Sequence, residues 1–203
     1  MLSALLQPLS LPSLPAASLP IPAYYSSPRG GLVTYHGPGQ LTIYPIVSLR
    51  QYGLGVRGYI DLLEGAVIRS FARFGVRARA DAINPGVWVG EGRESRKLAS
   101  VGIHVRRGVA SQGVGINIGA EVEAGFERVE ACGIPGVKVG WLKAEMIADA
   151  GKEGTYTGQG GTLGCPLRDV EQVVAQEMAL GLTGDKGVER VDLKQVADGG
   201  WKG

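Results

Sequence analysis

The stretch RGGLVTYHGPGQLTIYP, from Arg29 to Pro45, constrains this chain more than any other. Glycine at such density marks places where the backbone turns or approaches another group too closely for a side chain. The stretch ends in Leu41, Ile43 and Tyr44, an apolar pattern typical of a strand. It lacks both the Walker and the dinucleotide glycine patterns, so phosphate binding is only weakly indicated. What lies against this glycine surface is therefore the main question that the sequence raises.

Length and composition are those of an ordinary globular domain. The 203 residues are enough for one domain with a real core, and 44% are hydrophobic and 20% charged. A net charge of +2 argues against a strong nucleic-acid footprint. The two cysteines, Cys132 and Cys165, do not make a disulfide framework, which favours free thiols.

The first 28 residues differ from the rest of the chain, because they carry no charge and six prolines. The prolines interrupt any signal-peptide core, and the first arginine, Arg29, comes too late for a mitochondrial presequence. We predict an extended, poorly ordered lead-in over residues 1–28 and a frayed tail over residues 195–203. Residues 29–194 would then form the folded domain.

Helical and strand patterns mix along residues 57–182 without a strict βαβ rhythm. Apolar residues at helical spacing predict helices, and alternating ones predict strands. We expect helices at Arg57–Phe74, Trp141–Ala150 and Pro166–Leu182, and strands at Val76–Ala80, Gly86–Gly90, Lys97–Arg107 and Gly113–Ile118. The expected fold class is α+β, with helices packed on a mixed β-sheet.

Few side chains suggest chemistry by their context. Cys132 lies in a loop beside a glycine, where a thiol is often exposed, although a lone cysteine is more often a small buried residue. A dyad of Cys132 with His36 is possible. Lys97 begins a strand, where lysine is normally solvated and inert, but beside a thiol it could act as a base. Cys165 and His104 are interpreted as structural, and the spacing predicts no metal site.

Three blocks of the sequence resemble the octanoyl transferases, the lipoyl(octanoyl)-[acyl-carrier-protein]:protein transferases of lipoate synthesis. The first block is RGGLVTYHGPGQ, followed by Tyr44-Pro45. The second contains GVWV, KLASVG and VRRG, then Gly113 and Asn117, and the third is Cys132-Gly133. Order and spacing match the family from Arg29 to about Leu142, whereas the C-terminal third resembles it only loosely.

The resemblance implies the fold of the lipoate and biotin ligase catalytic domains, and transfer of an octanoyl group from acyl carrier protein to a lysine of a lipoyl domain. The acceptors would be lipoyl domains of 2-oxoacid dehydrogenase complexes and the glycine cleavage protein, and no cofactor, nucleic acid or membrane is expected. The resemblance places a thioester on Cys132 and its activating lysine at Lys97. The substrate-contacting residues that it implies are Arg29, Gly30, Gly31, Leu32, Val33, Thr34, Tyr35, His36, Ser100, Val101, Gly102, Gly113, Val114 and Gly115.

This interpretation offers an answer to the glycine question. Glycines let the backbone approach an eight-carbon chain, whose burial is worth about 0.8 kcal/mol per methylene. We expect Tyr35 and His36 to fix the polar end of the substrate. A lysine beside the thiol can take its proton and later deprotonate the incoming amine.

The chain also departs from the family pattern. Gln112 stands where the family has histidine, Ala131 stands where it has proline, and the proline-rich lead-in replaces a longer front segment. We therefore expect a domain truncated at its N-terminus, with reduced activity. Two alternatives stay open: an ATP-dependent lipoate-ligase-like enzyme, and an impaired family member acting as a binding protein. The family resemblance implies a mitochondrial location in a eukaryote and a cytoplasmic one otherwise.

Overall fold

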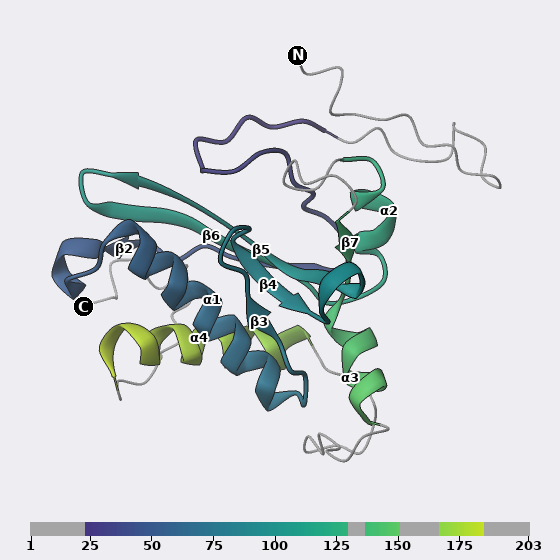
Figure 1. Cartoon of the computed structure of the whole chain (residues 1–203). Helices are drawn as coiled ribbons and strands as arrows, with labels where there is room; N and C mark the ends of the chain where they lie inside the picture. Colours follow the sequence, from purple (N-terminus) through teal and green to yellow (C-terminus); the bar gives the residue numbers. More distant parts are fainter. Residues whose placement is uncertain (1–22, 130–136, 151–166, 185–203) are drawn as a thin grey trace, which may run out of the picture.

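A computed structural model describes residues 23–129, 137–150 and 167–184. Its regular elements, labelled in Figure 1, are shorter strands and several helices around one long central hairpin. They are β1 (Gln40–Ile43), β2 (Val47–Ser48), η3 (Leu49–Tyr52), α1 (Val56–Arg73), β3 (Arg79–Ala80), β4 (Gly86–Val89), η4 (Gly92–Glu94), β5 (Arg96–Arg106), β6 (Val109–Asn117), α2 (Val122–Phe126), β7 (Lys138–Val139), α3 (Leu142–Ala150) and α4 (Leu167–Thr183). None of the helices within these described ranges is long and apolar enough to cross a membrane.

The strands form one sheet in the order β1-β6-β5-β4-β3, with antiparallel neighbours throughout. The short strand β2 pairs with β6, and β7 pairs with β5 in parallel. The expected mixed sheet is therefore confirmed. The β4–β5 hairpin that alternation predicts is present, with Val87 opposite Ala99.

The long helices α1 and α4 lie side by side and cover one face of the sheet (Figure 1). Alternate residues of β5 point to this face, as the sequence predicts, because successive side chains of a strand point to opposite sides. Ala99 of β5 and Ile116 of β6 are opposite one another and fully buried. Leu63, Val67 and Phe71 of α1 complete the core from the helical side.

Several boundaries differ from the sequence prediction for local reasons. The strand β6 begins at Val109, four residues before the predicted Gly113, because Arg107 and Gly108 form a tight hairpin turn with positive φ at both positions. This pattern is that of a type I′ turn, which matches the twist of antiparallel strands. The strand β3 is limited to Arg79–Ala80. The helix α1 ends as predicted, with Gly75 at φ +78° just beyond it.

The predicted lead-in and tail lie largely outside the described residues. Of the lead-in, only residues 23–28 are described, and they form neither helix nor strand. The carbonyl of Pro28 accepts a hydrogen bond from Nδ1 of His104 at 3.0 Å. His104 is thus half-buried on a strand and has a structural partner, which agrees with its interpretation as a structural residue.

Candidate functional site

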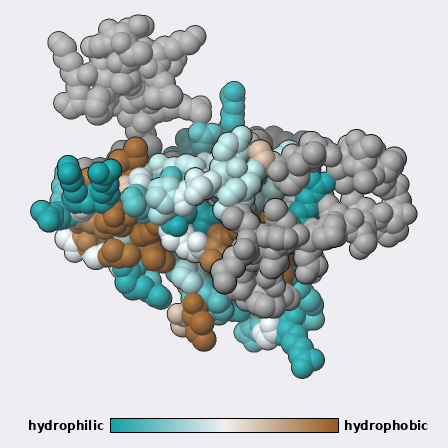
Figure 2. All heavy atoms as spheres, turned by 90° about the horizontal axis from the view of Figure 1, so that it is seen from above, coloured by the Kyte–Doolittle hydropathy of each residue, from teal (hydrophilic) through white to brown (hydrophobic). Residues whose placement is uncertain are grey.

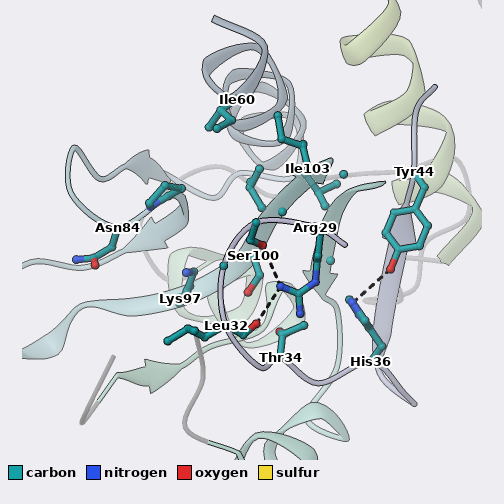
Figure 3. A pocket seen from close by; sticks show the side chains of 18 of the residues that line it. Arg29, Leu32, Thr34, His36, Tyr44, Ile60, Asn84, Lys97, Ser100 and Ile103 are labelled. Carbon is teal, nitrogen blue, oxygen red and sulfur yellow. Dashed lines mark hydrogen bonds between the residues drawn. The ribbon is translucent and has the colours of Figure 1, made fainter. Parts of the chain in front are cut away.

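A pocket of about 350 Å³ opens between the N-terminal end of α1, the β5–β6 hairpin and the segment 29–36 (Figure 3). This volume lies within the range of about 300–1,000 Å³ that is usual for small-molecule sites. Leu32 and Val56, both about half exposed, line the pocket and connect it to the surface. In the view of Figure 2, apolar surface gathers mainly on one side of the molecule and is bordered by polar residues.

The pocket forms where β5 changes its neighbour along one side, from β4 to the segment that follows Arg29. The strand β4 pairs with β5 only as far as Gly86, opposite Ser100. Further along β5, the N–H of Gly30 donates to the carbonyl of Ile103 at 2.9 Å, so the segment after Arg29 lies along the open edge. The space between the start of β4 and this segment is part of the pocket and is lined by Asn84, Pro85 and Ser100.

The face of the β5–β6 hairpin opposite the helices is lined by glycine. Gly102 pairs with Gly113, and Ser100 with Gly115. A Cβ at Gly102 would lie 2.9 Å from Cδ of Arg29, and one at Gly115 would lie 3.2 Å from Cε1 of His36. The glycine surface therefore receives the chain's own segment 29–36 directly. The same glycines also line the pocket, so their proposed contact with a ligand stays a prediction.

The predicted lysine lies at one end of the pocket. Lys97 is only 5% exposed, and its Nζ lies 5.1 Å from the centroid of the Trp88 ring, which faces it across β4 and β5. An ammonium over an indole face is a favourable cation–π arrangement. Trp88 is oriented in turn by a hydrogen bond from its Nε1 to the carbonyl of Asn84 at 3.1 Å. The lysine is therefore held in the interior and is not the solvated strand-end residue that its sequence position first indicates.

His36 lies on the opposite side of the pocket, next to Tyr44 (Figure 3). Its Nδ1 is 2.6 Å from Oε1 of Gln40, and its Nε2 is 3.3 Å from the hydroxyl of Tyr44. The rings of His36 and Tyr44 meet edge to face, with centroids 6.3 Å apart. The two polar ends of the pocket thus come from different elements, His36 from the glycine-rich segment and Lys97 from β5.

A chain of hydrogen bonds links the ring of His36 to the backbone carbonyl of Lys97. Asn117, which is 3% exposed, donates from Nδ2 to the carbonyls of Lys97 and Gly140, at 3.3 and 3.0 Å. Its Oδ1 accepts from Nε2 of Gln40 at 3.0 Å. The Oε1 of Gln40 is left to face His36, and an amide oxygen only accepts, so Nδ1 of His36 must carry a proton. The carbonyls of Lys97 and Gly140 fix the orientation of the Asn117 amide, which fixes that of Gln40. They therefore decide which ring nitrogen of His36 carries the proton.

Two predicted substrate residues lie outside the pocket. Arg29, Lys97 and every predicted substrate residue except Val33 and Tyr35 line it. Tyr35 instead packs edge-on against Phe126 of α2, with ring centroids 5.6 Å apart, in a small separate cluster. Burial raises the pKa of the Tyr35 hydroxyl, a rise that the charge of Arg128 opposes. The sequence predicts that Tyr35 and His36 fix the polar end of the substrate together, but it is the hydroxyl of Tyr44 that lies beside His36.

The predicted nucleophile Cys132 and the structural candidate Cys165 lie outside the described residues. The chain that follows Cys132 returns to the sheet beside Lys97, because Val139 of β7 pairs with Lys97. This edge is anchored by Arg96, whose guanidinium makes two hydrogen bonds of 2.9 and 3.0 Å to the Glu145 carboxylate. Hydrogen bonds with Lys138 lower the pKa of the Glu94 carboxyl at the same edge.

Several pocket residues escaped the sequence prediction. Val56 and Ile60 line the pocket from α1, and their i, i+4 spacing is visible in the sequence, but the spacing does not say what the helix faces. Asn84 and Pro85 belong to an irregular loop without a motif of its own. The described residues contain no cluster of three or more His, Cys, Asp or Glu side chains that could hold a metal ion. The arrangement suits a mainly apolar ligand with a polar group near a buried cation.

The family of the chain follows from its sequence over these same elements. Residues 22–150 match the family model of the lipoyl protein ligase A/B catalytic domain. The match covers the glycine-rich segment, α1 and the whole β5–β6 hairpin that together build the pocket. The chain belongs to this family.

The relatives that it matches include octanoyltransferases. One from Alkalilimnicola ehrlichii is 47% identical over 111 residues, which is 55% of this chain and 49% of the relative. One from a Shewanella species is 38% identical over 133 residues, which is 64% of this chain and 59% of the relative. The recognition of the octanoyl transferase family from three sequence blocks is confirmed. The chain spans only about half to three fifths of the length of these relatives.

Solved structures support the fold. A lipoate-protein ligase A bound with ATP superposes with a TM-score of 0.56 at 13% identity, over 83% of this chain and 62% of the ligase. A bipartite lipoate protein ligase from Thermoplasma acidophilum gives a TM-score of 0.54 at 15% identity, over 83% of this chain and 61% of the ligase. The predicted α+β fold of the lipoate ligase catalytic domains is therefore confirmed.

Proposed function

We propose that this protein transfers an octanoyl group from octanoyl-acyl carrier protein to a lysine of a lipoyl domain through a thioester on Cys132. The proposal is supported by membership of the family, by octanoyltransferase relatives and by a lipoate ligase fold. The observation that carries it is the position of Lys97 at the inner end of a pocket with apolar walls. A buried lysine beside an apolar pocket can act as a base next to a bound acyl chain. This arrangement suits transfer of the chain from one sulfur atom to another and then to a nitrogen atom.

The reaction consists of two acyl exchanges. In the first, Lys97 accepts the thiol proton, and the Cys132 sulfur attacks the carbonyl carbon of the donor thioester. A new carbon–sulfur bond forms, the donor carbon–sulfur bond breaks, and the carrier thiol leaves with a proton. In the second, the ε-amine of the acceptor lysine attacks the Cys132 thioester, its proton passes to the leaving sulfur by way of Lys97, and an amide forms.

The octanoyl chain would occupy the apolar part of the pocket. Ile60 of α1 and Ile103 of β5 line it on the same side, as Figure 3 shows. Burying seven methylene or methyl groups would contribute about 6 kcal/mol, at about 0.8 kcal/mol each. This gain in binding free energy is the reason why the acyl chain, and not the carrier protein, would occupy the pocket.

Intact-mass analysis tests the proposal. The chain is mixed with octanoyl-acyl carrier protein, and we expect an adduct of about 126 Da on the protein, which a lipoyl domain then removes. The variant Cys132→Ser should form no adduct and transfer nothing. Cys165→Ser is the matched control, because it removes the other thiol and should leave transfer unchanged. Transfer at the parental rate by Cys132→Ser would contradict the thioester mechanism.

The alternatives predict other outcomes in the same assay. A ligase-like enzyme would transfer free octanoate only when ATP is added, and it would not need Cys132. An impaired binding protein would retain octanoyl-acyl carrier protein without forming an adduct or a product.

The mitochondrial or cytoplasmic location stays a prediction, which fluorescence microscopy of the tagged full-length protein would test.

A further inference from the structure

Two side chains of opposite charge type are buried against Gly86, and the proposed reaction uses only one of them. Among the described residues, Lys97 and Glu64 are the charged types that are less than a tenth exposed, at 5% and 3%. Residues of these types are almost never buried to this extent unless they are paired. Glu64 therefore needs an explanation that the proposed reaction does not supply.

The helix brings Glu64 to the pocket. Val56, Ile60 and Glu64 are spaced by four residues on α1, so they lie on one face of the helix. The first two line the pocket, and Glu64 is buried one turn further along α1, outside the pocket lining. Burial raises the pKa of the Glu64 carboxyl, and the negative charge of Asp61 adds to this rise. A hydrogen bond from Gly86 and the positive charges of Arg57 and Lys97 lower the pKa and so oppose it.

Gly86 lies between the two buried side chains. Its N–H donates to Oε1 of Glu64 at 2.6 Å. Its backbone has φ +138°, and a Cβ there would lie 2.5 Å from Cε of Lys97 and 2.5 Å from the carbonyl of Ala99. The lysine stem therefore rests directly on the Gly86 backbone. The position of Gly86, and with it the start of β4, decides where the ammonium lies relative to the Trp88 ring two residues later.

We propose that Glu64 is a positioning residue for Lys97, which acts by holding the Gly86 N–H. The carboxylate receives a short, charge-assisted hydrogen bond, and it fixes the first residue of β4 in a conformation open to glycine but costly for other residues. The buried ammonium of Lys97 partly compensates the buried carboxylate. The role of Glu64 in transfer rests on the proposed function, whereas its effect on the position of Lys97 does not.

The test uses a signal that reports the position of Lys97 without any substrate. The ε-methylene protons of Lys97 should be shifted upfield by the Trp88 ring in spectra of protein labelled with 13C-lysine, and Lys97→Arg assigns the signal. Glu64→Leu removes the hydrogen bond, so we expect the upfield shift to be lost. Glu64→Gln retains an acceptor oxygen for Gly86, so we expect it to retain the shift. Asp61→Asn, at an exposed residue one turn earlier, is the matched control, because it removes a carboxylate that does not contact Gly86, and the Lys97 signal should stay upfield.

Kinetics give the second readout. In Glu64→Leu we expect kcat for octanoyl transfer to fall about 10- to 100-fold, by analogy with the loss of outer hydrogen-bond partners in metal sites, with KM for the acyl donor unchanged. Glu64→Gln should recover most of kcat. If Glu64→Leu fails to fold, Glu64→Asp provides a second test, because the shorter side chain retains the charge but withdraws the carboxylate from the Gly86 N–H, so the upfield shift should be reduced.

The outcomes separate the two proposals. A Lys97 signal that stays upfield in Glu64→Leu, or is lost in Glu64→Gln, overturns the role of Glu64. An upfield signal that is lost in Glu64→Leu, in a parent chain that transfers no octanoyl group, supports that role and contradicts the proposed function.

Discussion

Gly102 and Gly113 face each other across β5 and β6, and neither position has room for a side chain. At Gly102 the space is taken by Arg29, whose guanidinium donates to the carbonyls of Gly30 and Leu32 at 3.1 and 2.9 Å. At Gly113 it is taken by Ile43 and Pro45. The glycine pair thus binds both ends of the glycine-rich segment to the sheet. The pocket depends on this contact, because the segment supplies one of its walls.

Adding a methyl group at Gly113 should destabilise the fold. A Cβ there would collide with the carbonyl of Ile43 and lie 2.8 Å from Cδ of Pro45. Because backbone and a proline ring cannot move aside cheaply, we expect Gly113→Ala to cost about 1–3 kcal/mol of unfolding free energy. Urea denaturation measures this value.

Gly58→Ala is the control for this substitution. Gly58 is an exposed residue of α1 whose added Cβ would meet only Cδ2 of Leu54, at 3.8 Å. Replacing glycine by alanine inside a helix should stabilise the protein by about 0.5–1 kcal/mol. Equal effects of the two substitutions would show that the close packing at Gly113 does not matter.

Asn117→Leu should free the tautomer of His36. The substitution keeps the approximate volume but removes the donors to Lys97 and Gly140 and the acceptor of Gln40. The carbonyl of Lys97 still accepts from the N–H of Gly140 at 3.1 Å, so the loss falls on the Gly140 carbonyl and the Gln40 amide, and it should cost about 1–3 kcal/mol. Long-range 1H–15N spectra should show Nδ1–H for His36 in the parent and a mixture in the variant. His104 is an internal reference, since its Nδ1 donates to Pro28 in both. An unchanged His36 spectrum would contradict the chain of hydrogen bonds.

Lys97→Arg should separate proton transfer from charge. A guanidinium stays protonated, so it retains a cation that can stack on Trp88 but cannot accept the thiol proton. We expect octanoyl transfer to fall by about 10²–10⁴-fold, the usual contribution of a general base. Alkylation of Cys132 by iodoacetamide should fall less. Equal losses in the two rates would indicate that Lys97 acts through its charge or its shape.

Tyr59→Phe should remove an alkaline sensitivity of the fold. Tyr59 is fully buried in α1, its hydroxyl has no hydrogen-bond partner among the described residues, and burial raises its pKa to about 12. Between the ordinary pKa of about 10 and this value, the unfolded chain loses the proton and the folded chain retains it. Stability must therefore fall as pH rises through this range.

The variant lacks this group, so its unfolding free energy should fall less between pH 10 and 12 than that of the parent. At neutral pH we expect Tyr59→Phe to be more stable by about 1 kcal/mol, because the unsatisfied hydroxyl is gone. Denaturant titrations at several pH values measure both effects. Parallel pH dependence in parent and variant would be evidence against a buried, unpaired hydroxyl.

Local patterns predict the regular elements well. The helix at Val56–Arg73 and the strand at Arg96–Arg106 lie within a residue of their predicted bounds, because both carry a clear apolar period over many residues. The alternation of β5 also predicts which face is apolar. The start of β6 could not be predicted in the same way, because Val109–Gln112 lacks a strong alternating pattern and its pairing depends on the turn at Arg107 and Gly108.

The sequence by itself determined the family, the glycine surface and the candidates Lys97 and Cys132, because each rests on residue types at fixed spacing. Only the tertiary structure decided that Tyr44 and not Tyr35 lies beside His36, and that Glu64 and Lys97 are buried against the same residue, Gly86. Glu64 and Lys97 come from α1 and β5, and their proximity depends on how a helix packs on a sheet. No local pattern contains that information, since packing is decided by contacts between residues far apart in the chain.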